Sequence, residues 1–210
     1  MDLTTTIYLV RHGETEANVT NTLQGQSDVP LNANGVEQAQ LAGRRLRSKP
    51  FDIIWSSDLS RAAVTAREIA GERTITYTPL LREWDLGDWV GLTWSEIAEK
   101  YPEEAKEFNA GTPDAVIPGG ETRRQFYDRA QKILDTLTET FPGKTILCVS
   151  HGGVLRAMFN TLFQPQGKQR IRTDNTCICC VRYSHADATW TLVTWNDTAH
   201  LDAEALSSGW

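Results

Sequence analysis

Short apolar runs alternate along the chain with segments in which apolar residues recur every three or four positions. The runs are typical of buried strands, whereas the longer spacing is typical of amphipathic helices. Four apolar runs predict strands, at residues 5–10, 51–55, 74–77 and 145–149. Two more runs, at residues 177–183 and 189–195, flank His185-Ala186-Asp187 and predict a hairpin.

Helical spacing is found between these strands. The segments that show it lie at residues 36–46, 59–69, 126–137 and 154–163. Asn32 precedes the first of them and Ser57 or Asp58 the second, and side chains of these types often cap a helix. Because strands and helices alternate, we expect a three-layer α/β/α fold. Its central sheet should be mostly parallel, with an antiparallel edge strand from the hairpin.

Residues 81–120 interrupt this alternation. The segment is rich in Trp, Pro, Gly and acidic residues. We interpret it as a small helical cap insertion within a single domain that spans residues 1–210. Its tryptophans, among them Trp84, Trp89 and Trp94, either form the core of the cap or serve as substrate-facing walls.

Composition narrows the class of protein. The chain has 210 residues, of which 40% are hydrophobic, enough for a core. The net charge of −6 disfavours nucleic acid as a partner. No apolar run approaches the roughly 20 residues that span a bilayer, so a membrane partner is not expected. No signal peptide is visible, and a cytoplasmic location is therefore the default expectation.

Four cysteines lie in the second half of the chain, at positions 148, 177, 179 and 180. A metal or redox site is one interpretation of the three that are close together. No second pair or nearby histidine completes a zinc-like spacing, however. Small apolar residues in a buried strand are the simpler interpretation.

Two predicted strands end in a histidine followed by glycine. Arg11-His12-Gly13-Glu14 follows the first strand, and Ser150-His151-Gly152-Gly153 follows the strand at 145–149. Ligands of open parallel sheets bind beyond the carboxyl ends of the strands. The pattern therefore predicts one site that contains two imidazoles.

Arg61 belongs to the same predicted site. It lies in the first turn of the helix that follows the strand at 51–55. Helix N-termini favour anions, and an arginine fork can donate two hydrogen bonds to phosphate oxygens. Together with Arg11 and the two histidines, Arg61 indicates a pocket for a doubly charged phosphate.

Four sequence blocks resemble the histidine phosphatase superfamily, the phosphoglycerate mutase-like group, and occur in that family's order. They are Arg11-His12-Gly13-Glu14-Thr15, Ser56-Ser57-Asp58-Leu59-Ser60-Arg61-Ala62 with Thr65-Ala66, Leu81-Arg82-Glu83 with Gly87, and Ser150-His151-Gly152-Gly153. One block alone would be weak evidence, but four in order are specific. The resemblance covers residues 7–160.

The resemblance implies a role for each matching residue. His12 would be the nucleophile that forms a phosphohistidine. Arg11, Arg61 and His151 would hold the phosphoryl oxygens. The two guanidinium groups should lower the pKa of His12 and keep its imidazole neutral.

Glu83 would protonate the leaving oxygen and then activate water. Such an acid needs apolar surroundings, which Trp84 and Trp89 could supply. Asn18 would contact the phosphate, and Gln24 and Gly25 would border the pocket, with Gly152 at the phosphate-facing start of a helix. Arginines would replace the metal of other phosphoryl-transfer enzymes, so no metal and no cofactor are expected.

The same pocket can serve a phosphatase or a mutase. The family's glycolytic mutases usually carry Trp before the motif asparagine, where this chain has Ala17. Residues 84–92 are more similar to the bacterial phosphatase branch, although Val90 stands where that branch usually has Glu. We therefore expect a phosphatase that acts on a small phosphorylated metabolite, as a monomer or a homodimer. A mutase-type phosphotransferase, a non-catalytic phosphate-binding module and a Cys/His metal protein are the alternatives.

Overall fold

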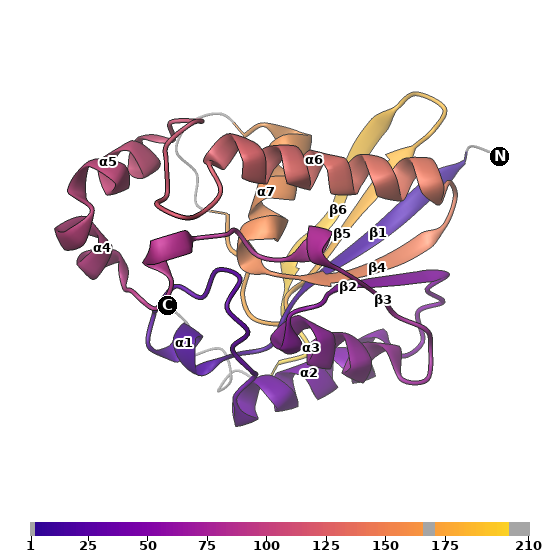
Figure 1. Ribbon diagram of the computed structural model, residues 1–210. Helices are drawn as coiled ribbons and strands as arrows, with labels where there is room; N and C mark the ends of the chain where they lie inside the picture. Colours follow the sequence, from indigo (N-terminus) through magenta and orange to yellow (C-terminus); the bar gives the residue numbers. More distant parts are fainter. Residues whose placement is uncertain (1–2, 166–170, 202–210) are drawn as a thin grey trace.

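The computed structural model describes residues 3–165 and 171–201, and these residues form a six-stranded sheet between two layers of helices (Figure 1). The strand order is β3-β2-β4-β1-β5-β6. The strands are β1 (Thr4–Arg11), β2 (Ile53–Ser57), β3 (Thr76–Thr78), β4 (Thr145–Ser150), β5 (Ile178–Ser184) and β6 (Thr189–Asp197). The first four pair in parallel, whereas β5 and β6 are antiparallel to their neighbours. The predicted α/β fold with an antiparallel edge is confirmed.

Alternation within the strands directs side chains to both faces of the sheet. In β1, Ile7 and Leu9 join one core cluster and Val10 joins the other. The first cluster is covered by α6 (Arg123–Thr140) and α7 (Gly152–Phe163), the second by α2 (Ala33–Leu46) and α3 (Ser60–Ala70). This two-sided burial explains the nearly continuous apolar runs of the parallel strands.

One predicted helix cap is correct and the other is wrong. The Asn32 side chain accepts a hydrogen bond from the Gly35 N–H and caps α2. The N-cap residue of α3 is Leu59, which has no side-chain cap bond. Instead Asp28, from a distant loop, accepts a hydrogen bond from the Ser60 N–H at 2.7 Å, while Asp58 pairs with Arg82. The cap of α3 is therefore a tertiary contact.

The segment after β3 contains short helices, as expected. They are the 3-10 turns Pro79–Leu81 and Gly87–Trp89, then α4 (Trp94–Lys100) and α5 (Pro102–Ala110). The last residues of this segment contact its first ones. Asp88 N–H donates to Pro118 O, and Glu121 N–H donates to Asp85 O. A Cβ on Gly87 would collide with the backbone of Pro118, and this close approach explains the glycine. A short helix α1 (Glu16–Val19) follows β1.

Candidate active site

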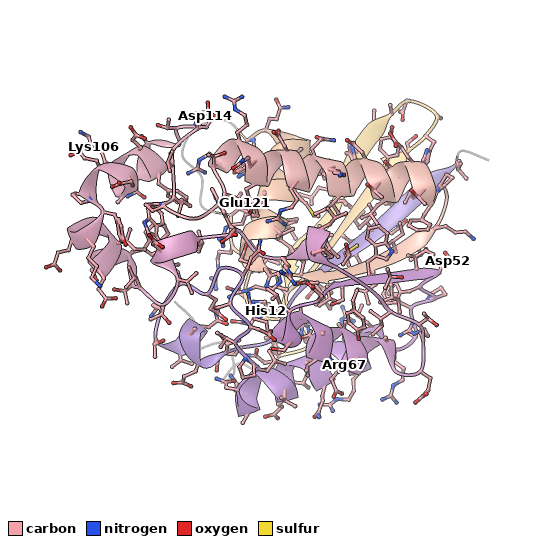
Figure 2. The ribbon with its side chains drawn as sticks, viewed as in Figure 1. His12, Asp52, Arg67, Lys106, Asp114 and Glu121 are labelled. Carbon is pink, nitrogen blue, oxygen red and sulfur yellow. The ribbon has the colours of Figure 1, made fainter. Side chains whose placement is uncertain are left out.

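His12 and His151 lie side by side because their strands are neighbours. Arg11 of β1 is in register with Ser150 of β4, and His12 N–H donates to Ser150 O at 2.9 Å. The two imidazole centroids are 5.1 Å apart with an interplanar angle of 60°. Both residues are buried, and Figure 2 shows His12 near the centre of the molecule. The predicted meeting of the two histidines is therefore observed.

The surroundings of His12 set its tautomer and its charge. Its Nδ1 lies 2.7 Å from Gly13 O, and because a carbonyl only accepts, Nδ1 carries the hydrogen. The lone pair is then on Nε2. Burial, followed by the charges of Arg61 and Arg11, lowers the pKa of His12 well below its usual value. The imidazole is thus neutral near pH 7 with one nitrogen available for attack.

Two arginines supply positive charge at this site. Arg61 is fully buried and donates through Nη1 to Ser27 O at 2.7 Å and through Nη2 to Gly25 O at 2.8 Å. Burial lowers the pKa of Arg61 to about 10, so the group remains charged at neutral pH. Arg11 Nη1 donates to Thr173 O at 2.6 Å, which fixes the second guanidinium.

Several buried nitrogens of this cluster lack a hydrogen-bond acceptor within the part of the chain that the structure describes. They are Arg11 Nε, Arg61 Nε and His151 Nδ1. His151 Nε2 lies 2.9 Å from Ser57 Oγ, and a neutral His151 that accepts there carries its hydrogen on Nδ1. Burial, then the neighbouring His12 and arginines, lowers the pKa of His151. Buried donors are costly unless paired, so the cluster fits an anion with several oxygens.

Glu83 lies against the first turn of α7. Its Oε2 accepts from Gly153 N–H at 2.9 Å, and its Oε1 accepts from Trp84 N–H at 2.9 Å. A Cβ on Gly153 would collide with this carboxylate, so the glycine makes the contact possible. Since His151 immediately precedes α7, the carboxylate belongs to the same end of the sheet as the two histidines.

The remaining predicted residues lie around this cluster through separate contacts. Thr15 Oγ1 lies 3.0 Å from both Asn18 Oδ1 and Gln24 Oε1. Gly25 contributes its carbonyl to Arg61. A Cβ on Gly152 would lie 3.1 Å from Thr173 Oγ1, which is tighter than most such contacts, and 3.4 Å from Arg11 Nε. The structure brings these four residues to the site, and their contact with a substrate stays a prediction.

Comparison with known proteins identifies the family. The model of the histidine phosphatase superfamily (branch 1) matches residues 7–198. The chain belongs to the histidine phosphatase superfamily. Over 207 residues it is 37% identical to a probable phosphoglycerate mutase GpmB of Salmonella choleraesuis, covering 95% of this chain and 96% of that protein.

Solved structures of other superfamily members are also similar. A phosphoserine phosphatase from Entamoeba histolytica, in complex with 3-phosphoglyceric acid, has a TM-score of 0.83 at 30% identity, covering 94% of this chain and all of that one. A putative α-ribazole-5'-P phosphatase from Escherichia coli has a TM-score of 0.81 at 29% identity, with coverages of 92% and 96%. These structural neighbours are phosphatases of the histidine phosphatase superfamily.

Some residues of this histidine phosphatase site had no role predicted from the sequence. Ser57 contacts His151, and Thr65 Oγ1 accepts from Gly13 N–H at 3.1 Å. Both occur in the block around Arg61, so their position beside a strand end and a helix turn was an available signal. Thr173, which holds Arg11, lies in the loop before β5 and carries no motif.

The tryptophans of residues 84–94 belong mainly to the cap core. The Trp84 ring stacks on Phe126 at 4.4 Å, and Trp89 is fully buried against Phe108. Trp94, by contrast, is 45% exposed. The expectation that Trp84 and Trp89 shield the acid finds no support in these contacts, since Trp84 meets Glu83 through its backbone N–H.

The four cysteines are buried, as expected for core residues. Burial raises the pKa of the Cys148 thiol to about 12 and so leaves it protonated. No cluster of three or more His, Cys, Asp or Glu suited to a metal ion occurs among residues 3–165 and 171–201. No helix in these same ranges is both long and apolar enough to cross a bilayer.

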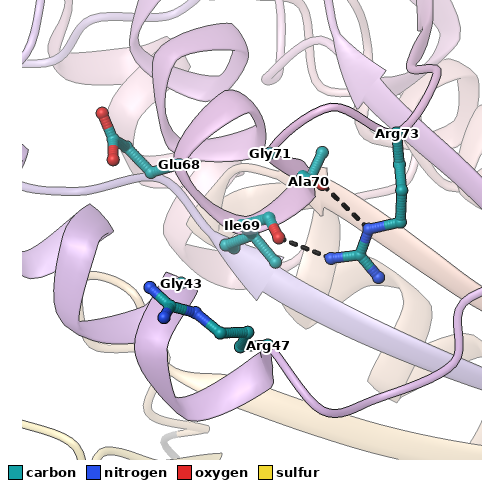
Figure 3. Close-up of a pocket in the computed structure, with 7 residues that line it drawn as sticks. All are labelled: Gly43, Arg47, Glu68, Ile69, Ala70, Gly71 and Arg73. Atoms are coloured by element: carbon teal, nitrogen blue, oxygen red, sulfur yellow. Dashed lines mark hydrogen bonds between the residues drawn. The ribbon is translucent and has the colours of Figure 1, made fainter.

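A separate cavity of about 320 Å³ lies between the carboxyl ends of α2 and α3, at the opposite end of α3 from Arg61 (Figure 3). Arg73 lines it, and its guanidinium donates to the carbonyls of Ile69 and Ala70. The Arg73 guanidinium therefore caps the end of α3, and the cavity has no pair of histidines like that of the cluster around His12 and Arg61.

Proposed function

We propose that this chain hydrolyses phosphomonoesters of small metabolites through a phosphohistidine at His12. One observation carries the proposal. A neutral His12, whose Nδ1 donates to Gly13 O, lies beside two charged arginines whose buried Nε atoms have no hydrogen-bond partner among the described residues. A nucleophile and an anion clamp are the two parts that phosphoryl transfer requires.

In the first step His12 Nε2 attacks phosphorus, and the bond from phosphorus to the leaving oxygen breaks. Glu83, entering the step protonated, passes its proton to that oxygen. In the second step the Glu83 carboxylate takes a proton from water, whose oxygen attacks the phosphohistidine and releases His12 and phosphate. Arg11, Arg61 and His151 stabilise the phosphoryl oxygens throughout, which is the main source of catalysis in such reactions.

The proposal includes no metal ion. In many phosphoryl-transfer enzymes a divalent cation neutralises the transferring group. Here two guanidinium groups can supply that charge, and their planar forks suit phosphate oxygens. Chelating agents should therefore leave turnover unchanged.

A mutase is the second candidate, because the Salmonella choleraesuis relative is a probable phosphoglycerate mutase. The two reactions share the phosphohistidine and differ in the acceptor of the phosphoryl group. The similar solved structures favour water as the acceptor, since they are phosphatases. Their substrates, phosphoserine and α-ribazole phosphate, together with phosphoglycerates, are the first phosphomonoesters to compare by kcat/KM.

The decisive experiment traps the intermediate. Wild-type protein should acquire ³²P from a labelled phosphomonoester, with one label per active site after an alkaline denaturing quench. His12→Ala should lose the label and at least about 10³-fold in turnover. The matched control is His185→Ala, in the distant β5–β6 hairpin, which should keep both. Wild-type turnover by His12→Ala would refute the mechanism, and stoichiometric anion binding without turnover would support the non-catalytic alternative.

The cellular location, oligomeric state and partners of this protein stay predictions. We propose a cytoplasmic enzyme, because four thiols without disulfides are what a reducing compartment favours. A monomer or homodimer and the absence of a nucleic-acid partner are likewise expectations, which sizing chromatography and binding measurements would test.

A further inference from the structure

All three guanidinium nitrogens of Arg129, in α6, donate hydrogen bonds. Arg129 belongs to none of the sequence blocks that resemble the family. Its fork meets one carboxylate, with Nε 3.0 Å from Glu121 Oε1 and Nη2 2.8 Å from Glu121 Oε2. The two side chains are only 13% and 22% exposed. The ring of Phe126 lies 5.1 Å from the guanidinium carbon. Such an enclosed, two-bonded pair holds its geometry much better than an exposed one.

The rest of the guanidinium holds the backbone around Glu83. Nη1 donates to Leu80 O at 2.9 Å and to Arg82 O at 2.6 Å. Nη2 also donates to Glu83 O at 3.0 Å. One planar group therefore fixes the carbonyl of Leu80 in the first 3-10 turn and those of Arg82 and Glu83 in the irregular segment 82–86 that follows it.

Glu121 holds the backbone on the C-terminal side of Glu83. Its Oε2 accepts from Asp85 N–H at 3.0 Å, and its backbone carbonyl accepts from Trp84 Nε1 at 2.9 Å. Its own N–H donates to Asp85 O at 2.9 Å. Arg129 thus fixes the chain up to Glu83 and Glu121 fixes the chain after it. Figure 2 shows Glu121 near the start of α6.

A general acid on an irregular segment needs such support. A displacement of about 1 Å can cost roughly 10²-fold in rate when a reacting group must be aligned. The Gly153 N–H limits the position of the Glu83 carboxylate, whereas the Glu83 backbone carbonyl is held by Arg129 Nη2 at 3.0 Å and by Gln26 Nε2 at 3.2 Å. Lysine could not replace Arg129, because an ammonium group cannot meet a carboxylate and three carbonyls in one plane.

We propose that the Arg129–Glu121 pair is a positioning device for the general acid Glu83, an inference that rests on the function proposed above. The pair touches no reacting atom. It holds Glu83 where its proton can reach the leaving oxygen, and it joins α6 and the cap to that position. Because Arg11 and Arg61 are held by other residues, the pair should affect proton transfer without affecting phosphate binding.

The rate loss should depend on the leaving group, whereas a general loss of structure would lower the rates for all substrates alike. p-Nitrophenolate leaves without a proton, whereas an alkoxide from glycerol phosphate needs one. Arg129→Lys and Glu121→Gln should lower kcat/KM for glycerol phosphate by about 10²-fold, because kcat/KM reports only the steps up to departure of the leaving group. For p-nitrophenyl phosphate the loss of kcat/KM should be a few-fold.

The chain offers a matched control on the same helix. Arg124 and Asp114 form a two-bonded pair at 2.7 Å, but they are 59% and 65% exposed and hold no part of the Glu83 segment. Arg124→Lys and Asp114→Asn should leave both rates unchanged. Thermal unfolding of every variant separates loss of fold from loss of alignment. If Arg129→Lys does not fold, Glu121→Gln carries the test, since its amide keeps the size of the side chain.

A double-variant cycle with Glu83→Gln distinguishes failure of this inference from failure of the proposed function. Adding Arg129→Lys to Glu83→Gln should cost no further selectivity, because residues that act as a unit are non-additive. If Glu83→Gln alone shows no leaving-group dependence, the acid assignment fails. If Glu83→Gln shows it and Arg129→Lys lowers both rates equally, only the positioning role is wrong.

Discussion

Close packing of a single glycine controls the position of Glu83. A Cβ on Gly153 would collide with Glu83 Oε1, so Gly153→Ala must displace the carboxylate or the start of α7. We expect kcat/KM for alkyl phosphates to fall by about 10²-fold, with a smaller loss of kcat/KM for p-nitrophenyl phosphate. Steady-state kinetics with both substrates would check this.

Gly111→Ala is the matched control for this prediction. Gly111 lies at the end of a helix, α5, and its Cβ would meet open space. Its left-handed backbone (φ of 81°) should cost roughly 1–2 kcal/mol of stability as alanine. Unchanged rates with a lower melting temperature would therefore separate strain from displacement of the acid. Equal rate losses in the two variants would contradict the role given to Gly153.

For single residues, the sequence predicts which side chains carry charge or act as nucleophile. It does not predict which side chains fix their positions. His12, His151 and Arg61 were predictable because each lies at a strand end or a helix start, where parallel sheets bind ligands. Arg129 lies on an amphipathic helix, where an arginine is ordinarily solvated. Its role becomes visible only once the chain has brought residues 80–85 and Glu121 around it.

Among the elements, α3 depends on a cap from a distant loop. Asp28 Oδ1 accepts from Ser60 N–H, and this bond is the main cause that lowers the pKa of Asp28. Asp28→Ala should cost about 1 kcal/mol of unfolding free energy, as the loss of a cap does. Because the same loop supplies the Ser27 and Gly25 carbonyls to Arg61, KM should also rise. Urea unfolding and steady-state kinetics measure the two effects.

Asp58→Ala is the comparison, because the sequence suggests Asp58 as a cap of α3 from its position just before the helix. It pairs with Arg82 at 2.6 Å, and both side chains are about a third exposed (31% and 36%). Exposed pairs contribute between 0 and about 1 kcal/mol. Asp58→Ala should thus leave KM unchanged. A rise in KM for Asp58→Ala alone would show that the local residue, not Asp28, organises the start of α3.

The elements themselves were largely predictable, because each buries one face and its apolar spacing records this. The positions of α2, α6 and the six strands agree with the predicted ones to within a few residues. Strand order was not predictable from periodicity, since β4 lies between β1 and β2 although it comes after both. The same limit explains the wrong cap of α3, because spacing along the chain contains no information about a loop 32 residues away.

For the whole molecule, burial of two neutral histidines should make the free energy of unfolding depend on pH. Burial and neighbouring positive charge lower the pKa of both His12 and His151 well below 6.5, so the folded protein holds them neutral. The unfolded chain binds protons on both from pH 6.5 downward. The unfolding free energy must therefore fall as pH falls below about 6.5, by up to roughly 1.4 kcal/mol per pH unit for each histidine.

Urea unfolding at pH 7.5 and 5.5, in buffer without phosphate, measures this loss. His12→Asn removes one titrating group, so its loss between the two pH values should be smaller than that of wild type. Asp58→Asn should keep the full loss, because the pKa of this carboxyl is lowered from 3.8 and the group does not titrate in that window. Equal losses in wild type and His12→Asn would mean that the fold tolerates a charged His12. A bound anion should reduce this loss of stability, since it stabilises charged imidazoles. Without an anion, the protein loses stability at moderate acidity because its fold keeps the nucleophile neutral.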